Sequence, residues 1–252
     1  MEYLYSFSLL LILTINVLTC IFVKAKKIIS ILIYLIALIL LIWKIVEFSY
    51  YAYIQNGTYP IEISHISYFL YGSVFVLGIK KLYYTAGFFA LISGIGYVFA
   101  GVVSPTSVIN SLPTYLFIMG LISHSLLLFG GMLVIFNYQK YSYKNLYFPY
   151  IFLGFVLLFA YLVSIKVFYP LASGLDNMFV IKLVKGNILS YFNITSSNEI
   201  NIFISVLVVI IICLLIFLFN FINNKIYKKR EENAYDFSIV SFIKQKINKQ
   251  QK

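Results

Sequence analysis

The sequence predicts an all-α fold, a polytopic bundle of seven membrane-spanning helices with the N-terminus outside and the C-terminus in the cytoplasm. Three observations carry this prediction. The chain is 62% hydrophobic and only 11% charged, whereas roughly a quarter of the residues of a soluble domain are charged. Several apolar runs reach the ~20 residues that cross a hydrocarbon core. Most of the basic residues lie in alternate loops and in the tail, as the topology of a membrane protein requires.

Apolar segments of spanning length occur at seven places along the chain. They cover about 5–23, 28–54, 61–79, 82–103, 112–136, 147–168 and 199–222. The second segment is long enough to require tilt. The stretch 178–192 is interrupted by charges, and we expect it to lie in the interface or to re-enter as a cap over the bundle.

Two regions of different character follow from this division. Residues 1–223 form the predicted seven-span bundle, and residues 224–252 form a basic cytoplasmic tail. In the tail, Ile239, Ile243 and Ile247 share one helical face beside several lysines. This pattern favours a surface helix attracted to anionic lipid.

The positions of the basic residues set the orientation. Fifteen of the nineteen Lys and Arg residues lie in the loops after the first, third and fifth segments or in the tail. Three lie on the opposite side, and Lys44 lies within the second segment. The positive-inside rule therefore places the N-terminus outside. Because the basic residues do not form one surface, no nucleic acid is expected as a partner.

Membrane lipids are instead the expected partners of a multi-pass protein of the cell membrane, and a homo-oligomer or another protein partner is left open. Cys20 and Cys213 lie within apolar segments, where cysteine packs as a small hydrophobic residue. A catalytic zinc site needs about three protein ligands, which two histidines and eight acidic residues supply poorly. No metal and no cofactor is expected.

The stretch 60–71, PIEISHISYFLY, begins an apolar segment with polar residues. Glu62 and His65 are three residues apart and share a face of a helix, with Ser64 beside them. Two interpretations are open. The residues form a polar site that opens to the outer surface, or they lie in the interface, where water reaches them without any function.

His124 lies at the middle of the fifth segment, where a polar side chain is costly and is by default a functional candidate. Small residues recur at helical spacing on its face, and similar stripes occur in the fourth segment: Gly120 and Gly131 with His124, Ala86, Ala90 and Gly94, and again Gly96 and Ala100. Such stripes indicate close helix packing. The alternative to a functional role is a histidine hydrogen-bonded to a neighbouring helix.

Lys44 and Glu47 form a second intramembrane polar group. They are three residues apart in the second segment and can neutralise each other. The pair is either structural, or it orients His124 or holds a lipid headgroup.

Three short motifs are similar to those of a known family. Tyr59-Pro60-Ile61-Glu62-Ile63-Ser64 is similar to a Leu-Pro-Leu-His-Leu-Cys stretch, and Ser64-His65 to the end of Asn-Pro-Cys-His. Ile122-Ser123-His124-Ser125-Leu126 is similar to a span with a lone histidine, and Asp176-Asn177-Met178-Phe179-Val180 to Asn-Tyr-Met-Phe-Leu. On these motifs the chain resembles the YwaF-like family of bacterial integral membrane proteins, whose animal relatives include a multi-span lipid acyltransferase.

The resemblance covers most of the second to seventh segments and implies lipid acyl transfer or ester hydrolysis in a cavity open to the outer leaflet. It implies Ser64 as nucleophile and His124 as base. The supporting polar residues are then Glu62, His65, Lys44, Glu47 and Asn177.

The chain departs from the family pattern at two positions, with Ser64 in place of cysteine and Glu62 in place of the bacterial histidine. A hydroxyl needs an adjacent base to act as a nucleophile, although serine–histidine pairs do perform acyl transfer. By helical rise, Ser64 lies about 6 Å and His124 about 18 Å below the start of their segments, so they meet only if the helix ends are staggered. Enzyme status is therefore left open, and the alternative is a non-enzymatic transporter, lipid-binding or accessory membrane protein.

Overall fold

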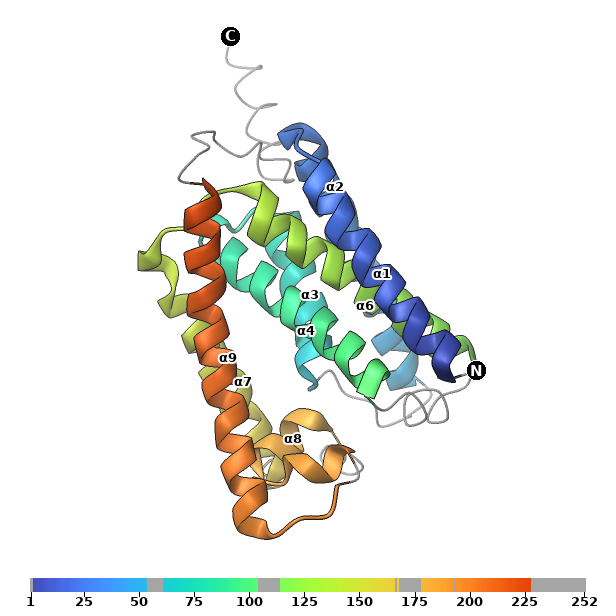
Figure 1. Cartoon of the computed structure of the whole chain (residues 1–252), viewed down its shortest axis with the longest axis vertical. Coiled ribbons are helices and arrows are strands. Elements are labelled where there is room, and N and C mark those ends of the chain that lie inside the picture. The colour runs from blue at the N-terminus through green and yellow to red at the C-terminus, as the bar shows by residue number, and fades with distance from the viewer. Residues whose placement is uncertain are drawn as a thin grey trace.

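The computed structural model describes residues 2–53, 61–103, 114–165, 167, 178–192 and 194–227. All regular secondary structure in these ranges is helical (Figure 1). The predicted all-α class is therefore confirmed for this part of the chain. The tail beyond residue 227, with its predicted surface helix, lies outside the described residues.

A long helix occupies each of the seven predicted segments. The helices are α1 (Glu2–Phe22), α2 (Lys26–Tyr53), α3 (Ile63–Leu77), α4 (Tyr83–Val103), α6 (Thr114–Met132), α7 (Tyr147–Ser164) and α9 (Asn198–Tyr227). A π-helical segment, η2 (Leu133–Tyr138), continues α6. The short helices are η1 (Lys80–Leu82), η3 (Tyr143–Asn145), α8 (Phe179–Val184) and η5 (Ile188–Phe192).

Five of the helical segments found in the described residues have the length and apolar composition of membrane spans, and the apolar parts of α1 and α3 are shorter. The chain therefore has the helices of a membrane protein. Helix α9 continues to Tyr227, beyond residue 223, at which the bundle was predicted to end.

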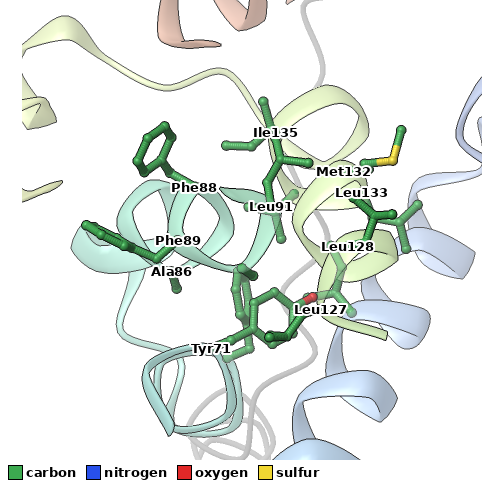
Figure 2. Packing of buried hydrophobic residues seen from close by; sticks show 14 of the residues in the cluster. Tyr71, Ala86, Phe88, Phe89, Leu91, Leu127, Leu128, Met132, Leu133 and Ile135 are labelled. Atoms are coloured by element: carbon green, nitrogen blue, oxygen red, sulfur yellow. The ribbon is translucent and has the colours of Figure 1, made fainter. Parts of the chain in front are cut away.

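Among the described helices, α4 and α6 form the most extensive contact. They meet at glycines, because a Cβ atom added at Gly94 would lie 2.6 Å from the Cα of Leu128, and one added at Gly131 would lie 2.7 Å from the Cα of Leu91. No side chain fits at such distances, so the two backbones touch. Figure 2 shows Leu91 of α4 facing Leu128 and Ile135 in the core beside this contact.

The contact follows one antiparallel register along both helices. Gly87 lies against Val134, Leu91 against Gly131, and Gly94 against Leu128. Steps of three and four residues on each helix keep these positions on one face. Close helix packing is therefore found at Gly94 and at Gly131, one member of each of two predicted stripes.

The predicted stripe of Gly96 and Ala100 is wrong at Gly96, where an added Cβ would meet nothing within 4 Å. Gly96 is two residues after Gly94, which turns it about 200° around the helix and away from α6. The same small residue type thus marks a contact on one face of α4 and open space on the other.

Helices α7 and α9 extend to one side of the α1–α6 bundle, with α8 near the end of α7 (Figure 1). A separate apolar cluster joins this region to the start of α3. Its buried members are Ile61, Val156, Ala160, Val163, Val180 and Ile181. The stretch predicted to lie in the interface or to cap the bundle therefore packs, through α8, against α7 and the start of α3.

Asn223 of α9 holds the C-terminal part of α9 against η2 and the residues that follow it. Its side-chain amide donates to the carbonyls of Ile135 at 2.7 Å and Gln139 at 3.0 Å, and its oxygen accepts the N–H of Tyr141 at 3.0 Å. These bonds satisfy backbone groups that the end of a helix leaves unpaired. They join α9 to the segment that follows η2.

The α4–α6 contact predicts opposite outcomes for two similar substitutions. Gly94→Ala should lower the free energy of unfolding by about 1–3 kcal/mol, because the added methyl group overpacks the contact. Gly96→Ala is the matched control, since it gains the same helix propensity without a clash. Thermal unfolding of both variants in detergent measures the difference, and equal stability would contradict the backbone contact.

Candidate functional site

His124 lies in the middle of α6, where aromatic rings from two other helices hold it. Its ring stacks on Tyr97 of α4, with ring centroids 4.1 Å apart and planes 9° from parallel. The ring of Tyr68 of α3 approaches it edge-on at 5.7 Å, and Tyr68 is itself fixed by a side-chain hydrogen bond with Ser123. The orientation of the histidine is therefore determined by packing from both sides.

Hydrogen bonding distinguishes the two ring nitrogens of His124. The backbone of Ser93 of α4 lies close to the ring. Nδ1 is buried and has no hydrogen-bond partner in the part of the chain that the structure describes. An imidazole that donates through Nε2 leaves Nδ1 as an acceptor. The ring itself is only half-buried.

The predicted pair of Lys44 and Glu47 is present in α2. Their charged groups are 2.7 Å apart, and the Lys44 side chain is 6% exposed. Glu47 also accepts hydrogen bonds from Trp43 at 3.0 Å and Tyr51 at 3.3 Å. Since Glu47 is held by three donors, the charge of Lys44 is balanced inside the bundle, as a buried ion requires.

The ion pair and the histidine belong to one continuous polar group. Lys44 Nζ lies 4.5 Å from the ring centroid of Tyr68, and the same ring contacts His124. A cation over an aromatic face is attracted to the ring. Helices α2, α3, α4 and α6 each contribute to this arrangement, which we call the central polar site: Lys44, Glu47, Tyr68, Ser93, Tyr97 and His124.

Glu62 performs a connecting role at the start of α3. Its carboxylate accepts the backbone N–H of Phe179 at 2.6 Å, which joins α3 to the first residue of α8. Glu62 lies before α3, outside the membrane-crossing helices. Burial raises its pKa to about 7, and hydrogen bonds from the backbone N–H groups of Phe179, Val180 and Ile63 act in the opposite direction. Glu62 and His65, which were predicted to share a face, contact different elements. Glu62 bonds α8, whereas the ring of His65 packs edge-on against Phe48 of α2 at 5.1 Å.

Ser64 is half-buried and lies one helical turn before Tyr68 on α3. Four residues of helix amount to about 6 Å of rise. Ser64 therefore lies about 6 Å from Tyr68 along the axis of α3, toward the start of that helix. The Nδ1 atom of His124 accepts no hydrogen bond from Ser64. Asn177, the remaining predicted site residue, lies outside the described residues.

No group of three or more metal-ligating side chains occurs within the described ranges. Cys20 is buried in the main core and Cys213 packs at its edge, and both are free thiols. Their positions agree with the predicted role as packing residues.

Three members of the central polar site were absent from the sequence prediction: Tyr68, Ser93 and Tyr97. One signal was available, because Ser93 and Tyr97 are four residues apart and bracket Gly94 on the packing side of α4. Tyr68 gave no comparable signal, since this chain has tyrosine and phenylalanine throughout.

Comparison with protein-family models, curated proteins and solved structures finds no match to this chain.

The Lys44–Glu47 pair predicts a strong dependence on which partner is removed. Lys44→Met should lower the free energy of unfolding by roughly 3 kcal/mol, because Glu47 loses its cation within the bundle. The double variant Lys44→Met with Glu47→Gln should regain most of this loss, since glutamine is neutral and still accepts from Trp43. Chemical unfolding in detergent measures both. A single variant as stable as the unmodified protein would show that the pair is not coupled to folding.

Proposed function

We propose that this chain is a seven-span protein of the cell membrane, related to the YwaF-like family, that acts on lipid acyl chains. In this proposal the N-terminus is outside, the C-terminus is cytoplasmic, and the site is reached from a cavity open to the outer leaflet. Membrane lipids are its partners. The orientation is supported by the fifteen basic residues on one side of the chain.

The observation that carries the proposal is the state of His124. A general base needs a lone pair directed at the proton that it removes. His124 supplies an unpaired acceptor, Nδ1, in the middle of the bundle, and Tyr97 and Tyr68 fix the ring. A histidine that served only for packing would be expected to use both nitrogens in hydrogen bonds.

The proposed reaction divides acyl transfer into two steps. The Ser64 hydroxyl oxygen attacks the ester carbonyl of a lipid while His124 accepts its proton, and the alcohol leaves with that proton. The resulting acyl-serine is then attacked by water or by an acceptor hydroxyl, and the serine regains its proton. Such serine–histidine chemistry is a known route to acyl transfer.

The first turn of α3 must move for this reaction, because proton transfer requires heavy atoms about 3 Å apart. Glu62 supports the movement in this scheme: it is the hydrogen-bonded connection between the start of α3 and α8. His65 and Glu62 then form the polar entrance to the site.

Activity of site variants tests the proposal. Purified protein is incubated with phospholipid, and free fatty acid and acylated acceptor are measured. Ser64→Ala and His124→Gln should each reduce turnover by at least about 100-fold, the contribution typical of a general base. Ser125→Ala is the control, since the Ser125 hydroxyl bonds the Leu121 carbonyl of its own helix. Turnover equal to the unmodified protein in Ser64→Ala would remove Ser64 from the mechanism.

A second function is favoured by the continuity of the central polar site. Lys44, Tyr68 and His124 are in contact through the bundle, and ionisable residues inside a membrane often line ion or proton paths. We therefore also propose a transporter or lipid-binding protein that performs no acyl chemistry.

Flux measurements distinguish this second function from the first. Proteoliposomes with a pH-sensitive dye inside should show proton flux that depends on pH and is lost in Lys44→Met. Ser64→Ala should leave that flux unchanged. Flux equal to that of protein-free vesicles would exclude a proton path.

A further inference from the structure

Two buried polar atoms in the central polar site have no partner among the described residues: Oγ of Ser93 and Nδ1 of His124. Ser93 is 7% exposed. Folded proteins rarely leave buried polar atoms without a hydrogen bond, and each exception requires a cause. Here two exceptions belong to neighbouring residues, since the backbone of Ser93 lies close to the His124 ring.

The free hydroxyl of Ser93 has a specific structural origin. Serine within a helix commonly bonds the carbonyl four residues earlier, and Ser67, Ser123 and Ser125 all do so here. For Ser93 that carbonyl belongs to Phe89, which the Ser67 hydroxyl of α3 also approaches at 3.1 Å while it bonds Ile63 at 2.5 Å. The Phe89 carbonyl is therefore shared between helices, and the Ser93 hydroxyl has no partner among the described residues.

The chemistry of the two atoms limits what can bind them. Nδ1 of His124 is an acceptor in the tautomer that carries its proton on Nε2. The Ser93 hydroxyl can donate or accept. A ligand group must therefore donate to Nδ1 and also bond a hydroxyl. An ester carbonyl cannot donate, whereas a hydroxyl can donate to one atom and accept from the other without bringing a charge into the site.

We propose that Ser93 and His124 together bind a hydroxyl group, which donates to Nδ1 of His124 and accepts from Oγ of Ser93. The hydroxyl belongs to water or to the glycerol of a lipid. The close packing of α4 against α6 positions both residues. The inference rests on these contacts alone and holds whether or not Ser64 is a nucleophile.

Nitrogen NMR on a single-histidine protein tests the inference. The chain has two histidines, so His65→Gln leaves His124 as the only one, and ¹⁵N-histidine labelling reports both of its ring nitrogens. At neutral pH we expect the proton on Nε2 and an Nδ1 resonance shifted by an accepted hydrogen bond. Adding Ser93→Ala should move the Nδ1 resonance, whereas Ser125→Ala, whose hydroxyl is engaged with Leu121, should leave it in place. Ser93→Cys replaces Ser93→Ala if that variant does not fold.

A lipid titration identifies the source of the hydroxyl. Monoacylglycerol carries free glycerol hydroxyls and should shift the Nδ1 resonance to saturation if a lipid is bound, while triacylglycerol, which has none, should not. A hydrogen-bonded Nδ1 that responds to Ser93→Ala and to neither lipid supports bound water. A proton on Nδ1, or a resonance that Ser93→Ala leaves unchanged, would overturn the inference.

Discussion

The direct contact between the backbones of α4 and α6 is the constraint on which the rest of the structure depends. At Gly94 and Gly131 the helices approach so closely that no Cβ atom fits between them. Lipid tails are as apolar as leucine side chains, so helices in a membrane gain little from hydrophobicity alone and associate through close packing and polar contacts. The register of this contact brings His124 opposite Tyr97 and beside Ser93.

Around this contact, polar groups are arranged so that charge is balanced while hydrogen-bonding capacity is left over. Lys44 is compensated by Glu47 at 2.7 Å, and Glu62 is engaged with the start of α8. His124 and Ser93 differ from these residues because each keeps an unpaired atom. Other buried atoms without a partner in the described ranges belong to Asn16, Tyr71, Thr85 and Asn220, but Ser93 and His124 are neighbours, and their proximity is the physical basis of both proposals.

The helices could be predicted from the sequence because a chain in lipid must pair its backbone groups within each segment. Hydropathy therefore located α1 to α9 to within a few residues. The pair of Lys44 and Glu47 could be predicted because both residues lie on one helix at a spacing of three. The stripe at Gly94 was recognised for a similar reason, but Gly96 shows that spacing alone does not reveal which face of a helix has a neighbour.

The parts of the site that could not be predicted depend on contacts between helices. The stacking of Tyr97 on His124 is set by the register of α4 against α6, and the sharing of the Phe89 carbonyl by the position of α3. The expected proximity of Ser64 to His124 depends on helix stagger in the same way. A pattern along one helix contains no information about such offsets.

The stacking of His124 on Tyr97 tests this account most directly, because it requires the α4–α6 register. In the His65→Gln protein labelled with ¹⁵N in histidine and ¹³C in tyrosine rings, solid-state NMR measures the dipolar coupling between the two kinds of ring. The account predicts strong coupling, as expected for centroids 4.1 Å apart, which falls in Tyr97→Phe to the weaker contribution of Tyr68 at 5.7 Å. No coupling, or coupling that Tyr97→Phe leaves unchanged, would contradict it.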